Sequence, residues 1–334
     1  MISTFYPMKL RGVPTYRIWG GSRLRDLYGK IGADEKTGES WELSVREKER
    51  SIIENGAYAG RTLYDFLDIA GNSVVSADYS GGRFPLLTKL IDAADKLSVQ
   101  VHPDDSYAKI HEGDLGKTEM WYIVDALPGS EIVYGLKPGL DSDDLRRAVE
   151  AGRTEDSLNF IKVKPGECYF IPAGLVHAIG NGILIAEIQQ NSDLTYRLYD
   201  YCRRDSDGKL RELHIDKALD VTKSFTPQEL NSLRFGCSEN KNTEQKSENV
   251  TTSLLAHCEY FKVLKYSVAS DTASLEFSAQ ADSFHSLLIV GGEGSIHCEG
   301  TDYHTRAGDS WFIPAGMGDY TVSGNLEFLF TTLK

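Results

Sequence analysis

Two segments in the first half of the chain alternate apolar and polar residues and carry side chains that can bind metals. In LSVQVHPDD, the two-residue period of a β-strand puts Ser98, Gln100 and His102 on one face and aliphatic residues on the other. In KTEMWYIV, the same period puts Lys117 and Glu119 on one face. We therefore expect one face of each strand to pack in a core and the other to line a polar cavity.

A third segment supplies another histidine. Residues 166–181 read G-x5-P-x-G-x2-H-x3-N, in which the histidine is His177. This pattern resembles the second conserved motif of the cupin superfamily, which implies a hairpin that presents His177 to the interior of a barrel. A lone buried glutamine or histidine is more often a hydrogen-bonded core residue than a ligand. A second histidine, delivered by a separate hairpin, favours a metal site.

The candidate ligands are Gln100, His102, Glu119 and His177, a mixed set of nitrogen and oxygen donors. Such a set suits zinc and leaves open positions for water or substrate. The same ligand types also suit iron and manganese. Because no cysteine is among the candidates, the set favours a catalytic site over a purely structural one.

The elements around these residues are mostly strands. Short β-branched and aromatic runs such as EIVYGL, CYFIPAG, GILIAEIQQ and SLLIVGG alternate with Gly, Pro and Asp. Helical periodicity is confined to short inserts. These inserts lie near residues 61–71, 105–114, 141–152 and 214–225. The predicted fold class is mainly β, with two jelly-roll (cupin) barrels and short helical inserts.

An internal repeat supports two barrels. The stretch GECYFIPAG at residues 166–174 recurs as GDSWFIPAG at residues 308–316, which indicates two copies of one β-rich module. His177 in the first copy corresponds to Asp319 in the second. If the histidine binds metal, the second copy has lost a ligand, so we expect one zinc per chain.

The length of 334 residues exceeds what one hydrophobic core usually supports, which predicts two domains. A stretch at residues 236–252 has almost no apolar side chain and is predicted to be a polar linker or loop. We therefore expect an N-terminal catalytic cupin domain with small helical inserts at residues 1–235. A C-terminal degenerate cupin domain is expected at residues 253–334.

Composition limits the partners and the compartment. The net charge is -13 and no run of Lys and Arg forms a basic stripe, which argues against a nucleic-acid partner. The five cysteines are scattered without a CxxC pair, which is typical of reduced thiols in a cytoplasmic protein. The first residues lack the features of a signal peptide, and no apolar run approaches about 20 residues. We therefore expect a cytoplasmic protein without a membrane partner.

Longer blocks of the sequence resemble a specific family. The blocks are PLLTKLIDAADKLSVQVHPDD, GKTEMWYIV, PAGLVHAIGNGILIAEIQQNSDLTYRLYDY and RELHIDKALDV, preceded by RIWGGSRL and ESWELS. In this order they resemble type I mannose-6-phosphate isomerases of the short bacterial form. The resemblance extends from near the start to about residue 225. It implies the zinc ligands Gln100, His102, Glu119 and His177, the same four residues that the strand pattern selects.

The resemblance also implies an activity, the interconversion of mannose 6-phosphate and fructose 6-phosphate. It places Lys89, Lys117, Glu187 and Arg197 around a small hexose phosphate substrate, and we expect Ser98 to contact the substrate with Lys89. Moving a proton between adjacent carbons forms an enediol(ate), whose negative charge a divalent cation stabilises.

The catalytic residues are expected to be Arg197, Lys117 and Glu187. Lys117 and Arg197 would add positive charge, while Glu187 would carry the proton because a general base must reach the C1 or C2 proton. Lys117 and a water at the metal are rival proton carriers. An alternative role for Glu187 is an ion pair with Arg197.

Two other functional classes remain open from the sequence. An iron dioxygenase of the cupin type would use similar His and Glu ligands. A sugar-binding cupin without turnover would share the fold, because a fold alone does not imply a function.

Overall fold

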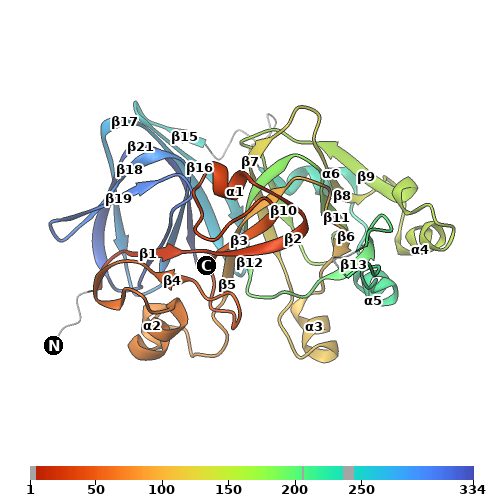
Figure 1. The fold of residues 1–334 in the computed structure, drawn as a ribbon, viewed down its shortest axis with the longest axis horizontal. Helices are drawn as coiled ribbons and strands as arrows, with labels where there is room; N and C mark the ends of the chain where they lie inside the picture. Colours follow the sequence, from red (N-terminus) through yellow and green to blue (C-terminus); the bar gives the residue numbers. More distant parts are fainter. Residues whose placement is uncertain (1–4, 205–206, 236–243) are drawn as a thin grey trace.

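The computed structural model describes residues 5–204, 207–235 and 244–334, and it has two lobes along its longest axis (Figure 1). Strands from the C-terminal part of the chain build most of one lobe, and strands from the preceding residues build most of the other. Strands dominate and the helices are short, which confirms the predicted mainly β class. The assignment of two separate barrels and of domain boundaries stays a prediction.

One lobe contains an antiparallel sheet that we call the C-terminal sheet. Two of its strands come from the other end of the chain, since β1 (Met8–Arg11) pairs with β20 (Ser310–Ile313) and β4 (Ile52–Ile53) pairs with β1. The N-terminal region thus extends the sheet of the C-terminal region. In order, the strands are β15 (Glu244–Lys246), β16 (Val250–His257), β17 (Lys262–Ala279), β21 (Gly318–Thr332), β18 (His285–Cys298), β20 (Ser310–Ile313), β1 (Met8–Arg11) and β4 (Ile52–Ile53), with β19 (Thr301–Arg306) on β18.

The other lobe contains two sheets, which we call the central sheet and the outer sheet. The central sheet has the order β14 (Arg234–Phe235), β10 (Cys168–Ile171), β7 (Glu119–Ala126), β12 (Ile183–Gln190), β5 (Leu86–Ala93), β2 (Val13–Gly21) and β3 (Thr37–Leu43). The outer sheet has the order β13 (Tyr196–Tyr199), β6 (Val99–Val101), β11 (His177–Ile179), β8 (Glu131–Leu136) and β9 (Leu158–Lys162).

The helices lie in the connections between strands. The four predicted inserts correspond to α2 (Leu63–Ala70), α3 (Asp105–His111), α4 (Ser142–Glu150) and α5 (Ile215–Val221). The helices α1 (Arg23–Asp26) and α6 (Pro227–Ser232) and the 3-10 turns η1 (Gly56–Tyr58), η2 (Asn72–Val74) and η3 (Thr154–Ser157) are too short for a periodic pattern. Among the helices of the described residues, none is long and apolar enough to cross a membrane.

The two copies of the sequence repeat fold in the same way locally. Strand β10 in the first copy and β20 in the second occupy equivalent positions of the repeat. The glycines that open them, Gly166 and Gly308, have φ angles of 89° and 90°. These left-handed conformations favour glycine, which explains why both copies keep it.

The predicted polar linker is only partly described. Residues 236–243, which include Cys237, lie outside the described residues. Residues 244–246 form β15, and Val250 begins β16, which pairs with β15. A polar segment can form an edge strand here because the backbone supplies the hydrogen bonds and the side chains can face solvent.

Strand β12 packs on both of its faces, since all eight of its residues are buried. Ile183 and Ile185 pack with residues of the outer sheet, and they lie in phase with Glu187. Leu184 and Ile188 face the opposite way and pack with residues of the C-terminal sheet. The alternation of side chains along a strand therefore assigns one face of β12 to each neighbouring sheet.

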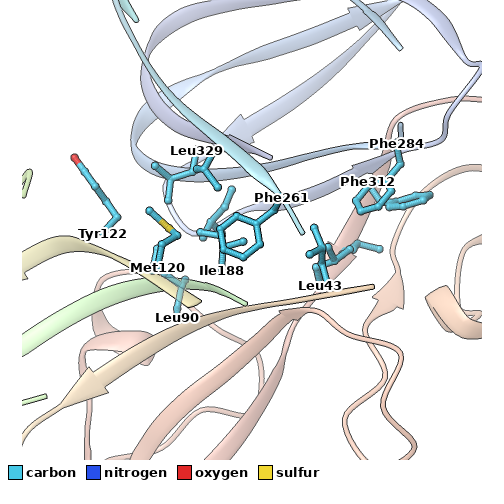
Figure 2. Packing of buried hydrophobic residues seen from close by; sticks show 14 of the residues in the cluster. Leu43, Leu90, Met120, Tyr122, Ile188, Phe261, Phe284, Phe312 and Leu329 are labelled. Atoms are coloured by element: carbon cyan, nitrogen blue, oxygen red, sulfur yellow. The ribbon is translucent and has the colours of Figure 1, made fainter. Parts of the chain in front are cut away.

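The core between the central and C-terminal sheets is rich in aromatic side chains (Figure 2). Met120 and Leu90 of the central sheet lie beside Phe261, which precedes β17, and beside Leu329 of β21. Phe261 has no exposed surface, so its whole ring packs in the junction between the lobes.

We predict that Phe261→Ala lowers the free energy of unfolding by about 3–5 kcal/mol, since it removes a buried ring and leaves a cavity. Chemical denaturation measures this change. The matched control is Phe160→Ala on β9, because the Phe160 side chain is 42% exposed. Equal effects of the two substitutions would contradict the role given to the junction.

Candidate metal centre

A row of side chains crosses the inner face of the central sheet. Glu187 on β12 lies opposite Lys89 on β5 on one side and opposite Trp121 on β7 on the other. One residue pair further along the strands, Gln189 lies opposite Glu119. Side chains that are opposite one another on neighbouring strands share a face of the sheet, so these five residues point into the lobe together.

A second row crosses the outer sheet. Gln100 on β6 lies opposite His177 on β11 and opposite Arg197 on β13. His102 follows directly after β6, where the chain leaves the sheet toward α3. Gln100, His102 and His177 therefore come from adjacent strands of one sheet, while Glu119 reaches them from the facing central sheet.

The two histidines are held in one tautomer by backbone carbonyls. His102 Nδ1 donates to the carbonyl oxygen of Leu194 at 2.7 Å, and His177 Nδ1 donates to that of Leu175 at 2.8 Å. Because a carbonyl only accepts, each neutral ring carries its proton on Nδ1 and keeps a lone pair on Nε2. The two Nε2 atoms lie 3.1 Å apart, so two lone pairs converge on one point.

The electrostatic surroundings keep these histidines neutral. Burial lowers the pKa of His177 to about 3. Burial, with the positive charge of Lys117, also lowers the pKa of His102 well below its usual value. Neutral imidazole is the form that binds a metal.

Glu119 completes the cluster. Its Oε2 lies 3.5 Å from His102 Nε2, and its Oε1 lies 3.5 Å from His177 Nε2. Oε1 is buried and has no hydrogen-bond partner among the described residues, which is costly for an ionised oxygen. A metal ion would satisfy this oxygen and both imidazole lone pairs, so the donor set fits a divalent cation.

Gln100 and Lys117 lie next to the cluster. The side-chain amide nitrogen of Gln100 is 3.4 Å from His177 Nε2, and turning the amide about its Cγ–Cδ bond presents the oxygen instead. Lys117 Nζ lies 3.0 Å from His102 Nε2 and donates to Glu119 Oε2. Burial alone would lower the pKa of Lys117, but the carboxylates of Glu119 and Glu187 outweigh burial and raise it.

The structure places the other predicted residues around one cleft of about 770 Å³. The cleft opens beside the cluster of His102, Glu119 and His177. It is lined by the predicted residues Ser98, Lys89, Glu187, Gln100, Lys117 and Arg197. All nine predicted site residues therefore line the cleft or belong to the adjoining cluster of candidate metal ligands. Their individual roles stay predictions.

Glu187 lies between a lysine and a tryptophan. Its Oε1 is 3.7 Å from Lys89 Nζ, and its Oε2 accepts a hydrogen bond from Trp121 Nε1 at 3.0 Å. Burial and the nearby carboxylate of Glu119 raise the pKa of Glu187. Arg197 is oriented by the carbonyl oxygen of Glu212, which accepts from its Nη1 at 2.8 Å.

Glu39 and Arg17 also line the cleft, and the sequence patterns did not single them out. Glu39 is buried and accepts hydrogen bonds from Trp41 Nε1 and from Arg17. Burial alone would raise the pKa of Glu39, but Lys89 and Arg17 outweigh burial and lower it to about 2. The only signal was the alternation in ESWELS, which puts Glu39 and Trp41 on one face.

Among the described residues, one group of His, Cys, Asp and Glu side chains has metal-binding geometry, and it is the cluster of His102, Glu119 and His177. The second copy of the repeat has no comparable cluster among these residues. Asp319, at the position equivalent to His177, is exposed on β21 and accepts a hydrogen bond from Ser278 of β17.

Comparisons of the sequence point to one family. The family model described as "Phosphomannose isomerase type I, catalytic domain" matches residues 8–124, and "Mannose-6-phosphate isomerase, cupin domain" matches residues 250–333. The mannose-6-phosphate isomerase ManA of Bacillus subtilis (strain 168) is 39% identical over 331 residues, which cover 99% of this chain and 100% of that protein. The mannose-6-phosphate isomerase of Streptococcus mutans is 36% identical and matches 97% of each chain.

Solved structures agree with these sequence matches. The crystal structure of the mannose 6-phosphate isomerase from Bacillus subtilis superposes with a TM-score of 0.85 at 36% identity, over 97% of this chain and 99% of that chain. A variant of phosphomannose isomerase from Salmonella typhimurium superposes with a TM-score of 0.76 at 17% identity, over 98% and 99% of the two chains. The second match shows that the fold is shared.

We predict that the protein binds about one metal ion per chain and that His102→Ala abolishes this binding, since loss of an imidazole leaves too few strong donors. Elemental analysis of the purified proteins measures the metal content. His304→Ala is the control because His304 is exposed on β19, and it should retain the metal. A metal-replete His102→Ala protein would rule out this centre.

Proposed function

The chain belongs to the type I mannose-6-phosphate isomerase family, and from this premise we propose that its cleft interconverts mannose 6-phosphate and fructose 6-phosphate through an enediolate at a zinc centre. The observation that carries the proposal is the convergence of His102, Glu119 and His177 beside a cleft lined by cations and one candidate base. The family match favours this activity over an iron dioxygenase and over a sugar-binding cupin without turnover.

We propose zinc as the metal, with Gln100 as a fourth ligand. Zinc prefers a small number of nitrogen and oxygen donors, and a catalytic zinc keeps an open position. When bound, it would polarise the oxygens at C1 and C2 of the sugar, without redox chemistry that could divert the enediolate. The Glu119 oxygen, which has no hydrogen-bond partner among the residues that the structure describes, and the two facing imidazole nitrogens support this choice of site.

The cleft residues would share the remaining tasks. Lys117 and Arg197 would place positive charge where the enediolate oxygens develop negative charge, which lowers the barrier most effectively in a site with little water. Lys89 on β5 and Ser98, which precedes β6, both line the cleft and would bind and orient the substrate. In a chain whose net charge is -13, these cations would supply the local positive charge that attracts a phosphosugar.

Glu187 is our candidate for the proton carrier. It has one oxygen held by Trp121, and its other oxygen, Oε1, is buried without a hydrogen-bond partner among the described residues. A general base needs such an available oxygen within reach of a carbon-bound proton. The base would take the proton from C2 of mannose 6-phosphate and return it to C1, while the hydroxyl proton passes from O2 to O1.

We propose a cytoplasmic location, which is consistent with the reduced cysteines Cys168, Cys202, Cys258 and Cys298, and we propose no nucleic-acid or membrane partner. The partner that we propose is a small hexose phosphate, bound in the cleft as the substrate.

The direct test is a coupled assay of the conversion of mannose 6-phosphate to fructose 6-phosphate. We predict turnover by the purified protein, loss of activity after exhaustive chelation, and recovery when zinc is added back, because the metal supplies the electrophile. Activity unaffected by complete metal removal would refute the zinc mechanism, and absence of turnover in the zinc-replete protein would refute the proposed reaction.

We predict that Arg197→Ala lowers kcat by about 10²-fold or more, the scale of removing one donor to a developing oxyanion. Steady-state kinetics with mannose 6-phosphate separates kcat from KM. Arg146→Ala is the control, because Arg146 lies on α4 and pairs with the exposed Asp216. A change confined to KM would instead assign Arg197 to the substrate's phosphate, and unchanged kcat and KM would remove both roles.

A further inference from the structure

Trp121 lies between His177, a candidate metal ligand, and Glu187, the candidate base. Its side chain has no exposed surface, and it stands on β7 directly opposite Glu187 on β12. The indole Nε1 donates to Glu187 Oε2 at 3.0 Å. The edge of the same ring system meets His177, with ring centroids 5.3 Å apart and an interplanar angle of 78°.

The two oxygens of Glu187 consequently have different surroundings. Oε2 is held by the indole, whereas Oε1 has no hydrogen-bond partner among the described residues. The ammonium of Lys89 lies 3.7 Å from Oε1, which is beyond hydrogen-bond distance. The indole is therefore the group that fixes the rotation of this carboxylate.

We propose that Trp121 is a positioning residue for the isomerisation: its indole N–H clamps Glu187 Oε2 so that Oε1 faces the substrate carbons at a fixed distance from the metal cluster. The inference rests on the proposed role of Glu187 as the proton carrier. Trp121 itself touches neither substrate nor metal and acts through Glu187.

The indole that holds Glu187 is itself closely packed. The Trp121 ring packs among buried residues of the inner core and against His177, whose own ring is fixed by the carbonyl of Leu175. A carboxylate held this way would lose little freedom when substrate binds, and proton transfer depends steeply on the alignment of the base. A phenylalanine would fill most of the same space but could not donate.

The sheet offers comparable indole and phenol donors, which makes the assignment testable. Trp41 Nε1 donates to Glu39 rather than to Glu187. Tyr169, the neighbour of Trp121 on β10, donates through its hydroxyl to Glu167 at 2.6 Å. Tyr169→Phe therefore removes a donor from a buried aromatic residue next to Trp121 without touching Glu187.

The test is a double-mutant cycle of Trp121→Phe and Glu187→Gln in the zinc-loaded protein. We expect Trp121→Phe to lower kcat about 10- to 100-fold through misalignment of the base, with KM and zinc content unchanged. We expect Trp121→Phe to cause no further loss in the Glu187→Gln background, because a residue that acts only through Glu187 cannot act in its absence. Tyr169→Phe should leave kcat unchanged.

A second readout follows the proton itself. The rate at which deuterium from heavy water enters the product at the transferred position should fall in Trp121→Phe together with kcat. A wild-type kcat for Trp121→Phe, a loss of zinc from it, or additive losses in the double mutant would each overturn the inference. A wild-type kcat for Glu187→Gln would instead overturn the proposed proton carrier, so the two failures are distinct.

Discussion

The site depends most on electron-pair donors that converge on one point. Two imidazole Nε2 atoms face each other at 3.1 Å, and a buried carboxylate oxygen with no hydrogen-bond partner among the described residues lies 3.5 Å from one of them. The carbonyls of Leu194 and Leu175 fix both rings, so neither can turn its proton toward the other. Lys117 Nζ contacts one of the two nitrogens, at 3.0 Å, and a divalent cation would satisfy all three donor atoms, which ties the geometry of the site to its chemistry.

Holding this cluster requires two sheets at a fixed separation. The proposed ligands Gln100 and His177 come from the outer sheet and His102 directly follows its strand β6, while Glu119 comes from the central sheet. The central sheet can carry polar residues on its inner face because its other face is covered by the aromatic core of the C-terminal sheet. We therefore infer that the second lobe serves the site by packing behind it, even though its repeat carries Asp319 in place of a histidine.

Much of this site could be predicted because strands alternate strictly. The pattern around Gln100 and Glu119 already assigned their side chains to a polar face, and the glycine-rich hairpin supplied His177. Glu187 followed from the family resemblance. Register across strands is a tertiary property, so the sequence could not reveal that Trp121 stands opposite Glu187. The pairing of β1 with β20 was equally hidden, because it joins segments from the two ends of the chain.

We propose that His102, Glu119 and His177 together hold a single zinc ion. A crystal structure of the zinc-loaded protein, with anomalous data collected on both sides of the zinc absorption edge, would locate this ion. We predict one anomalous peak per chain, at about 2.0–2.2 Å from the two Nε2 atoms and from a Glu119 oxygen. A peak at another position, or a second peak of equal height in the C-terminal sheet, would contradict the account.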